Sequence, residues 1–421
     1  MRWRMMAAAC LVFGAGAGAQ AAEIAIACSS LGQEYEICRQ GVDAWARQSG
    51  HSVKIVSTPN SATDRLGLFQ QLLAAGAGDV DVFQIDVVWS GLLGRHLVDL
   101  GPKAAGVAGE HFPALIQNNT VDGRLVALPW FADAGLLYYR TDLLEKYGRP
   151  APETWQDLAE TARIVQEGER RAGRGDLWGF VWQGRAYEGL TTNALEWIAS
   201  HGGGTIVDPA GEITINNPKA VEALKGAASW IGRISPEGVL NYTEEEARGV
   251  FQAGNAVFMR NWPYAWALAQ GADSPVRGKV GIRPLPKGGA EGRSAGTLGG
   301  QELAVSKYSK NQEIAVDLVL YLTGAAEQKR RAIAGSFNPT IPALFRDPEI
   351  RKAAPFIGEL SGVFETAVAR PAAVTGDDYN KVSSEFYNAI HQALSARTPP
   401  ERALAGLDRD LKRIKRGGWR D

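Results

Sequence analysis

The sequence predicts an α/β protein of two domains, and three observations support this prediction. Short apolar stretches alternate with amphipathic helical stretches in the N-terminal part, which is typical of a doubly wound α/β domain. Residues 80–85 form a near-continuous apolar run, as in a strand buried inside a parallel sheet. The length of 421 residues exceeds what one hydrophobic core usually holds.

The elements follow in order from hydrophobic periodicity and helix-start signals. Thr154 with Asp157 three residues later predicts one helix start, and Asn217 followed by Pro218 predicts another. Residues 278–300 are rich in Gly and Pro and predict an irregular stretch with turns. We expect strands at 23–27, 52–56, 80–85, 135–139, 257–259 and 302–306, and helices at 35–49, 65–75, 154–165, 217–231, 312–321, 382–394 and 404–414.

Residues 1–22 predict a secretory signal peptide that is not part of the fold. Arg2 and Arg4 are basic, an apolar stretch follows over 5–19, and small residues indicate cleavage near Ala21 or Ala22. No later stretch approaches the roughly 18 apolar residues of a membrane helix. We therefore expect an exported, soluble, periplasmic protein.

Removal of the signal peptide leaves two cysteines, Cys28 and Cys38. In an oxidising compartment, an even and closely spaced pair most simply forms a disulfide. A redox or metal site is the alternative, but the spacing is not CxxC and no histidine flanks the pair. We expect a disulfide that stabilises the fold by roughly 2–3 kcal/mol.

Signatures of catalysis, metal binding and nucleic-acid binding are missing from the sequence. It has no Walker loop, GxSxG, HExxH or zinc-type Cys/His cluster. The net charge of −1 gives no electrostatic footprint for nucleic acid. We therefore expect no catalytic residue, metal, cofactor or nucleic-acid partner. The sequence carries no signal for homo-oligomers, and we expect a monomer.

Carboxylates, aromatic rings and arginines gather instead near the predicted strand ends. Asp86 follows the buried strand 80–85, at the edge where open α/β sheets bind ligands. Carboxylates and arginines hydrogen-bond several hydroxyls at once, and aromatic walls with a few polar groups suit a sugar. The candidate side chains are those of Glu34, Glu36, Arg65, Asp86, Phe131, Asp133, Trp262, Tyr264 and Arg370.

Structural roles compete with this interpretation. Glu34 and Glu36 lie at a helix start, where acids suit the helix dipole. Trp262 and Tyr264 also suit an interdomain core, and Arg370 a surface ion pair.

Four segments, in this order and spacing, resemble extracellular solute-binding proteins of ABC sugar importers, close to the trehalose/maltose-binding branch. They are residues 79–89 (DVDVFQIDVVW), 133–144 (DAGLLYYRTDLL), 251–259 (FQAGNAVFM) and 338–342 (NPTIP). The resemblance covers nearly all of the mature chain. It implies a two-lobed periplasmic binding protein fold, with crossover hinge strands and a ligand cleft between discontinuous lobes. The implied lobes are 23–130 plus 300–345 and 131–299 plus 346–421.

The resemblance also implies a function: capture of a trehalose- or maltose-type disaccharide by hinge closure, and its delivery to the membrane permease of an ABC transporter. Phe131 stands where the family often has Tyr, and Gln301 where a Trp often stacks on the sugar, so the sugar's identity stays open. The implied sugar contacts are Glu34 or Glu36, Arg65, Asp86, Asp133, Trp262, Gly299, Gly300 and Arg370.

Two other functions stay open. The first is a secreted glycan-active enzyme that uses two of the acids Glu34, Asp86 and Asp133. The second keeps the binding-protein fold but changes the ligand to a polyamine or a chelated metal. Arg65 and Arg370 argue against a polyamine, and the sequence lacks the Tyr and His clusters that metal capture favours.

Overall fold

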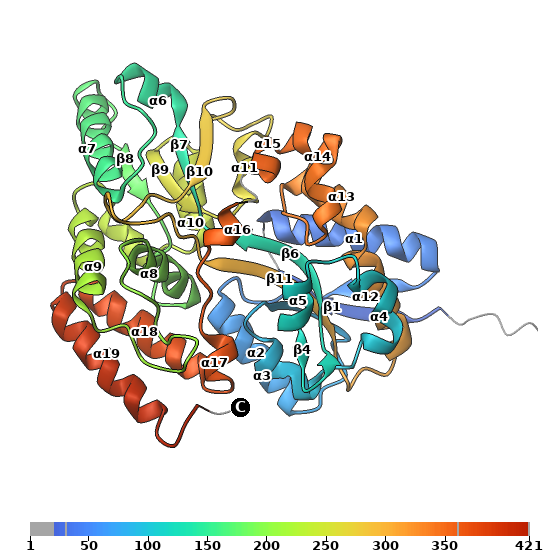
Figure 1. Ribbon diagram of the computed structural model, residues 1–421. Coiled ribbons are helices and arrows are strands. Elements are labelled where there is room, and N and C mark those ends of the chain that lie inside the picture. Colours follow the sequence, from blue (N-terminus) through green and yellow to red (C-terminus); the bar gives the residue numbers. More distant parts are fainter. Residues whose placement is uncertain (1–20, 30–31, 360–361, 420–421) are drawn as a thin grey trace, which may run out of the picture.

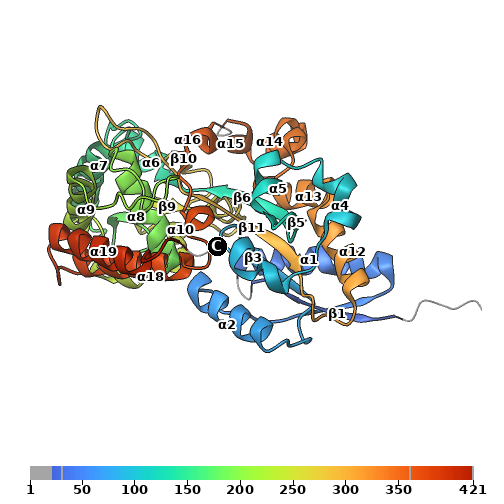
Figure 2. The ribbon, with the colours of Figure 1, turned by 60° about the horizontal axis from the view of Figure 1, so that its bottom comes forward.

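The computed structural model describes residues 21–29, 32–359 and 362–419, which form two lobes side by side (Figures 1 and 2). Each lobe is a β-sheet covered by helices, so the α/β prediction is confirmed. All but the last two residues of the predicted signal peptide lie outside the described residues. None of the described helices is both long and apolar enough to cross a bilayer.

The first lobe is built on a five-stranded sheet in the order β2-β1-β3-β11-β6. β1 pairs in parallel with β2 and β3, whereas β11 runs antiparallel to β3 and β6. Every residue of β3 is buried, as its apolar pattern predicts. The strands are β1 (Glu23–Ala27), β2 (Ser52–Ile55), β3 (Val82–Asp86), β6 (Leu128–Ala134) and β11 (Leu298–Val305), with a small hairpin of β4 (Thr120–Val121) and β5 (Arg124–Leu125). The helices are α1 (Gly32–Ser49), α2 (Ala62–Ala74), α3 (Ser90–Leu93), η1 (Gly94–His96), α4 (Gly101–Ala108), α5 (Pro113–Asn118), α12 (Gln312–Thr323) and α13 (Ala325–Gly335).

The second lobe is built on a four-stranded sheet in the order β10-β7-β9-β8. Its main core lies between this sheet and the helices α7, α8, α9, α18 and α19, which Figure 2 shows gathered on one side. The strands are β7 (Leu136–Arg140), β8 (Trp178–Val181), β9 (Ala256–Asn261) and β10 (Val280–Pro284). The helices are α6 (Thr141–Lys146), α7 (Trp155–Arg171), α8 (Glu188–Ser200), α9 (Pro218–Trp230), η2 (Glu237–Asn241), α10 (Glu244–Gln252), α11 (Ala265–Ala269), α18 (Tyr379–Leu394) and α19 (Pro400–Ile414). Short helices link the lobes near the C-terminus: η3 (Pro342–Arg346), α14 (Pro348–Ala353), α15 (Pro355–Glu359), α16 (Val363–Thr366) and α17 (Ala372–Thr375).

Every predicted strand and helix is present in the predicted order, but five strands of the described residues are missing from the prediction: β4, β5, β6, β8 and β10. The prediction of an irregular stretch over 278–300 is wrong at β10, which lies within it. The Thr154 capping box and the Asn217 cap are both present. α1 begins at Gly32 and α2 at Ala62, each three residues earlier than predicted. Of the missing strands, β6 contains Pro129 and lies at the edge of its sheet, where proline is tolerated.

Three chain segments pass between the lobes next to one another. Gly135 alone separates β6 of the first sheet from β7 of the second. Thr297, directly before β11, forms a parallel bridge with Val368 in the third segment. The Val368 N–H also donates to the carbonyl of Gly296 at 2.9 Å. The three segments therefore form one narrow hydrogen-bonded connection.

The lobe boundaries expected at 130/131 and 299/300 fall inside β6 and β11. A boundary inside a strand would divide one hydrogen-bonded ladder between two lobes. We propose instead that the chain changes lobe at Gly135 and Thr297, where the sheet membership changes.

Cys28 and Cys38 form the predicted disulfide. Both are fully buried, and the bond ties the end of β1 to α1.

Replacing both cysteines in the variant Cys28→Ala/Cys38→Ala should lower the free energy of unfolding by about 2–3 kcal/mol. The bond joins residues separated by 10 positions, so its loss frees a loop in the unfolded chain. Urea unfolding of the oxidised wild type and the variant measures the effect. Coincident unfolding curves would contradict the prediction.

Glu302 is a fully buried carboxyl in β11, beside a register shift between Gln301 and Glu302. The Ser90 hydroxyl donates a hydrogen bond to its Oε2 at 2.6 Å. Burial raises the pKa of Glu302 to about 8, and the nearby charge of Asp86 acts in the same direction. The folded protein therefore holds a proton here that the unfolded chain releases near pH 4.5.

The isosteric variant Glu302→Gln should become more stable than the wild type as the pH rises from 4.5 towards 8. A raised folded-state pKa stabilises the fold fully below pH 4.5, and this stabilisation is lost as the pH rises through about 8. Within that window the difference in unfolding free energy should grow by up to about 1.4 kcal/mol per pH unit. Urea unfolding at several pH values tests this, and a difference independent of pH would refute it.

Candidate functional site

A polar cavity of about 100 Å³ lies between the two lobes. It combines charged side chains from both lobes with two aromatic rings. Ten of the twelve residues expected at the site line it: Glu34, Arg65, Asp86, Asp133, Trp262, Tyr264, Gly299, Gly300, Gln301 and Arg370. The other lining residues are Ser29, Gln33, Asn60, Ala62, Glu188, Gly189, Thr192, Glu244 and Glu245.

A second cavity is larger, at about 790 Å³, and shares Gly299 and Arg370 with the first. Its walls are mainly apolar and include Phe112, Phe345 and Phe364. A polyol needs convergent hydrogen-bonding groups, so the smaller polar cavity is the better candidate for a ligand of this class.

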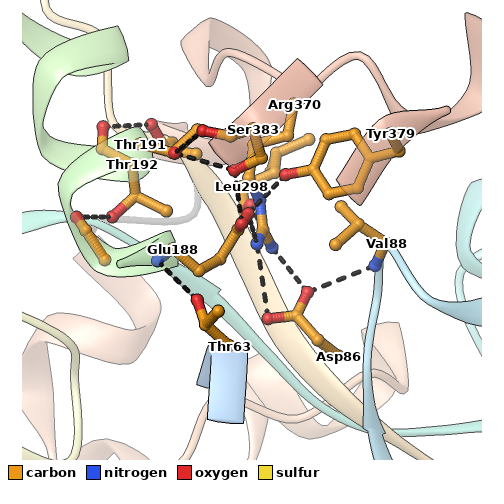
Figure 3. Close-up of polar contacts among 12 residues, drawn as sticks. Thr63, Asp86, Val88, Glu188, Thr191, Thr192, Leu298, Arg370, Tyr379 and Ser383 are labelled. Carbon is orange, nitrogen blue, oxygen red and sulfur yellow. Dashed lines mark hydrogen bonds and ion pairs between the residues drawn. The ribbon is translucent and has the colours of Figure 1, made fainter. Parts of the chain in front are cut away.

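Arg370 lines the polar cavity and joins the two lobes through ion pairs with Asp86 and Glu188 (Figure 3). Its guanidinium donates to both carboxylate oxygens of Asp86, at 2.6 and 3.3 Å, and to Glu188 Oε1 at 2.8 Å. Asp86 is the last residue of β3 in the first lobe, and Glu188 is the first residue of α8 in the second. The Arg370 side chain is only 1% exposed, so both ion pairs are shielded from water.

Glu188 is held by further contacts at the start of α8. Its carboxylate accepts hydrogen bonds from the hydroxyls of Tyr379 and Ser383. Its backbone N–H donates to the Thr63 hydroxyl of α2 at 3.1 Å, which is a second contact between the lobes (Figure 3). Glu188 is therefore fixed in place and touches both lobes.

Glu34, which is half-buried, and Asp133, which is buried, place two interacting carboxyls at the cavity wall. Burial raises the pKa of the Glu34 carboxyl, while the Arg65 charge and a hydrogen bond from Gln84 oppose the shift. Gln84 Nε2 donates to Glu34 Oε2 at 3.1 Å and to Gln301 Oε1 at 3.2 Å. Burial, and next the charge of Glu34, hold the pKa of Asp133 well above its usual range.

Two side chains that line the cavity carry polar groups without a hydrogen-bond partner among the described residues. Within the described part of the chain, no group donates a hydrogen bond to the Asp133 carboxylate, which is 8% exposed. The Arg65 Nε is buried and likewise lacks an acceptor among the described residues. The Arg65 guanidinium lies 6.0 Å from the centre of the Trp89 ring. The cavity thus offers both an acceptor and a donor to a ligand.

Trp262 and Tyr264 form the aromatic part of the wall. The Trp262 Nε1–H donates to Glu244 Oε1 at 3.3 Å, and the Tyr264 hydroxyl donates to Glu245 Oε1 at 2.6 Å. The two rings are therefore oriented by acids at the start of α10. Such rings can pack against the apolar face of a sugar.

Gly299 and Gly300 bring backbone close to the cavity at the start of β11. Gly300 has a φ of +127°, and a Cβ there would overlap the Phe131 carbonyl. A Cβ at Gly299 would lie 3.1 Å from the Trp262 ring. Both positions therefore favour glycine for a conformational or a packing reason.

Two residues expected at the site lie elsewhere. Glu36 is two residues after Glu34 on α1, a rotation of about 200°, so it faces outward and pairs with Arg39 at 2.6 Å. Phe131 is 2% exposed and packs in the core, with its ring 4.7 Å from that of Phe337.

Three acids that line the cavity were not predicted from the sequence: Glu188, Glu244 and Glu245. All three lie in the first turn of a helix, where an acid suits the helix dipole without any ligand. Glu244 and Glu245 also sit within the Thr243 capping box, which gives them a plain structural explanation. The sequence therefore carries no signal that distinguishes them.

The described residues contain no group of three or more His, Cys, Asp or Glu that could hold a metal ion. Asp86, one of the acids considered for glycan cleavage, is already bound by Arg370 through both oxygens. The arrangement suits hydrogen bonding to a polyhydroxylated molecule.

Comparisons with known proteins give a consistent result. A probable ABC transporter-binding protein of Deinococcus radiodurans is 54% identical over 411 residues, 97% of each chain. The maltodextrin-binding protein MdxE of Bacillus subtilis is 29% identical over 264 residues, covering 60% of this chain and 58% of that one. The structure of maltose-bound T. maritima MalE3 has a TM-score of 0.88 and 41% identity, covering 94% of this chain and all of that one.

The family described as bacterial extracellular solute-binding protein matches residues 29–329. With the similar structures, this match confirms the two-lobed fold and the resemblance inferred from the sequence. It also confirms a binding protein rather than an enzyme, so the glycan-cleaving alternative is withdrawn. The chain belongs to the bacterial extracellular solute-binding protein family.

Proposed function

We propose that this protein captures a maltose- or trehalose-type disaccharide in the cavity between its lobes and delivers it to the permease of an ABC transporter. The observation that carries the proposal is that Asp133, Arg65 and Trp262 line one cavity, where the Asp133 carboxyl and the Arg65 Nε have no hydrogen-bond partner among the described residues.

Buried polar groups without partners destabilise a fold by about 1–3 kcal/mol each. A ligand that supplies both donors and acceptors removes this cost, and each hydroxyl of a sugar does both. A polyamine would supply donors only and would leave Arg65 unpaired beside a cation. A neutral sugar therefore satisfies the cavity better than a polyamine.

The groups that would contact the sugar come from both lobes. Glu34 and Arg65 belong to the first lobe, and Trp262 and Glu244 to the second. A ligand that touches both sets binds the closed arrangement more tightly than an open one, so it shifts the population towards closure. Closure would then present a single surface to the permease.

The relatives support a sugar as the ligand class. MalE3 is described as maltose bound, and MdxE as a maltodextrin-binding protein. Gln301, at the place where the family often has a stacking Trp, bonds to Gln84 instead, so we propose that Trp262 and Tyr264 supply the stacking surface. We further propose that residues 1–22 direct export to the periplasm and that the protein acts as a monomer.

The purified exported protein should bind one of maltose, trehalose, sucrose or glucose in titration calorimetry, and its tryptophan fluorescence should change with the same saturation curve. Spermidine and ferric iron, tested alongside, should give no heat. Binding of either cation with no response to any sugar would keep the fold but refute the proposed ligand class.

The variant Asp133→Asn should weaken sugar binding at least tenfold, or about 1.4 kcal/mol, because it replaces a carboxylate acceptor with an amide. Its free energy of unfolding at pH 7 should stay equal or rise, because burial already disfavours the charged carboxylate. Asp176→Asn, at an exposed position outside the cavity, is the matched control. Unchanged affinity in Asp133→Asn would remove Asp133 from the site.

A further inference from the structure

Arg260 and Glu196 form a fully buried ion pair behind the cavity wall. Both side chains are 0% exposed. Arg260 Nε donates to Glu196 Oε2 at 2.9 Å, and the second guanidinium nitrogen donates to Glu196 Oε1. A third nitrogen donates to Gln183 Oε1 at 3.2 Å. Neither residue lines the cavity, so neither is expected to touch a ligand.

The pair lies against two of the three segments that connect the lobes. A Cβ at Gly135 would overlap both the Glu196 carboxylate and the Arg260 guanidinium. The Thr297 N–H donates to Glu196 Oε1 at 3.0 Å. The pair therefore fills the space that a side chain at residue 135 would need. It also accepts a hydrogen bond from the backbone of a second crossing segment, at Thr297.

The same guanidinium supports the aromatic wall of the cavity. Arg260 Cζ lies 3.9 Å from the centre of the Trp262 ring, the closest cation–ring distance among the described residues. A buried guanidinium over an indole is attracted to the negative face of the ring, and burial strengthens this attraction. The ring also donates a hydrogen bond to Glu244 and lies next to Gly299. Arg260 is therefore one of three neighbours that together set its orientation.

Stability alone does not require this arrangement. A buried ion pair gains little over well-packed apolar residues of similar volume, because both charges lose their hydration. However, the two residues of the pair contact different features of the molecule. Glu196 accepts a hydrogen bond from Thr297 in a segment that crosses between the lobes, and Arg260 packs on the Trp262 ring, which lines the cavity.

We propose that Arg260 and Glu196 are positioning residues that fix the Trp262 ring relative to the lobe crossings. This inference rests on the proposed sugar-binding function, because it assigns Trp262 the role of ligand platform. The pair acts on the ligand only through Trp262.

Arg260→Lys should weaken maltose binding about tenfold, because lysine keeps the charge but loses both the flat stacking surface and the two-pronged contact with Glu196. Combined with Trp262→Ala, the same change should have less than a twofold further effect on affinity. Effects that multiply would show that Arg260 acts independently of Trp262 and would overturn the inference. Arg140→Lys is the matched control, because Arg140 is also buried and paired with one acid, Asp142, but lies outside the cavity.

A ligand-free measurement separates this inference from the proposed function. In protein labelled with 5-fluorotryptophan, the Trp262 resonance is identified by its loss in Trp262→Phe. We expect it to shift or broaden in Arg260→Lys and to stay unchanged in Arg140→Lys. An unchanged resonance in Arg260→Lys overturns the inference whether or not maltose binds. Absence of sugar binding by the wild type, with the resonance shifted, refutes the proposed function alone.

A second variant covers the case in which Arg260→Lys does not fold. Arg260→Met/Glu196→Met removes both charges and leaves no unpaired ion. It should retain the wild-type urea midpoint more closely than Arg260→Ala, yet show the displaced Trp262 resonance and the weakened maltose affinity. Wild-type affinity and an unmoved resonance in this double variant would contradict the inference.

Discussion

The passage of three neighbouring chain segments between the lobes is the constraint on which the rest of the structure depends. Backbone hydrogen bonds join Thr297 and its neighbours to Val368, and the short link at Gly135 runs alongside. Because the crossings lie next to one another, we propose that the lobes separate by rotation about this band of segments. The facing surfaces on one side of the band then form a cleft.

Each crossing also carries a group of the candidate site close by. Asp133 lies two residues before Gly135, Gly299 two residues after Thr297, and Arg370 two residues after Val368. The floor of the cavity is thus made of the same backbone that connects the lobes. In the proposed rotation, residues on the two walls, such as Glu34 and Trp262, would move with their own lobes. This arrangement links ligand contact to lobe position without any long-range pathway.

The acids of the site lower the stability of the fold, because burial disfavours their charged forms. The raised pKa values of Glu34 and Asp133 indicate this effect of burial. The buried guanidinium of Arg370 compensates Asp86 and Glu188, but Asp133 has no donor of this kind among the described residues. Binding sites often retain such groups at the expense of stability, because a ligand provides the missing partners.

Much of the fold could be predicted from the sequence, because its signals are local. The buried strand β3, the Thr154 and Asn217 caps and the Cys28–Cys38 pair all depend on residue type and spacing. The edge strand β6 could not, because Pro129 and the polar Asp133 within it do not form a strand pattern.

The candidate site was predictable where polar residues follow buried strands, as Asp86 does. It was not predictable where tertiary packing decides the outcome. Phe131 faces the core because Phe337, more than 200 residues along the chain, lies beside it. Glu188 reaches the site because Arg370 and α2 meet the start of α8, and neither contact has a local signal.

Measurement of the distance between the lobes in solution tests whether they close on a bound sugar. Spin labels at Gln71→Cys on α2 and Glu385→Cys on α18, both exposed positions, report on opposite lobes. We expect a longer or broader distance distribution without sugar and a single shorter distance when the bound disaccharide saturates the protein. Identical distributions in the two states, under conditions where calorimetry shows the sugar bound, would contradict it.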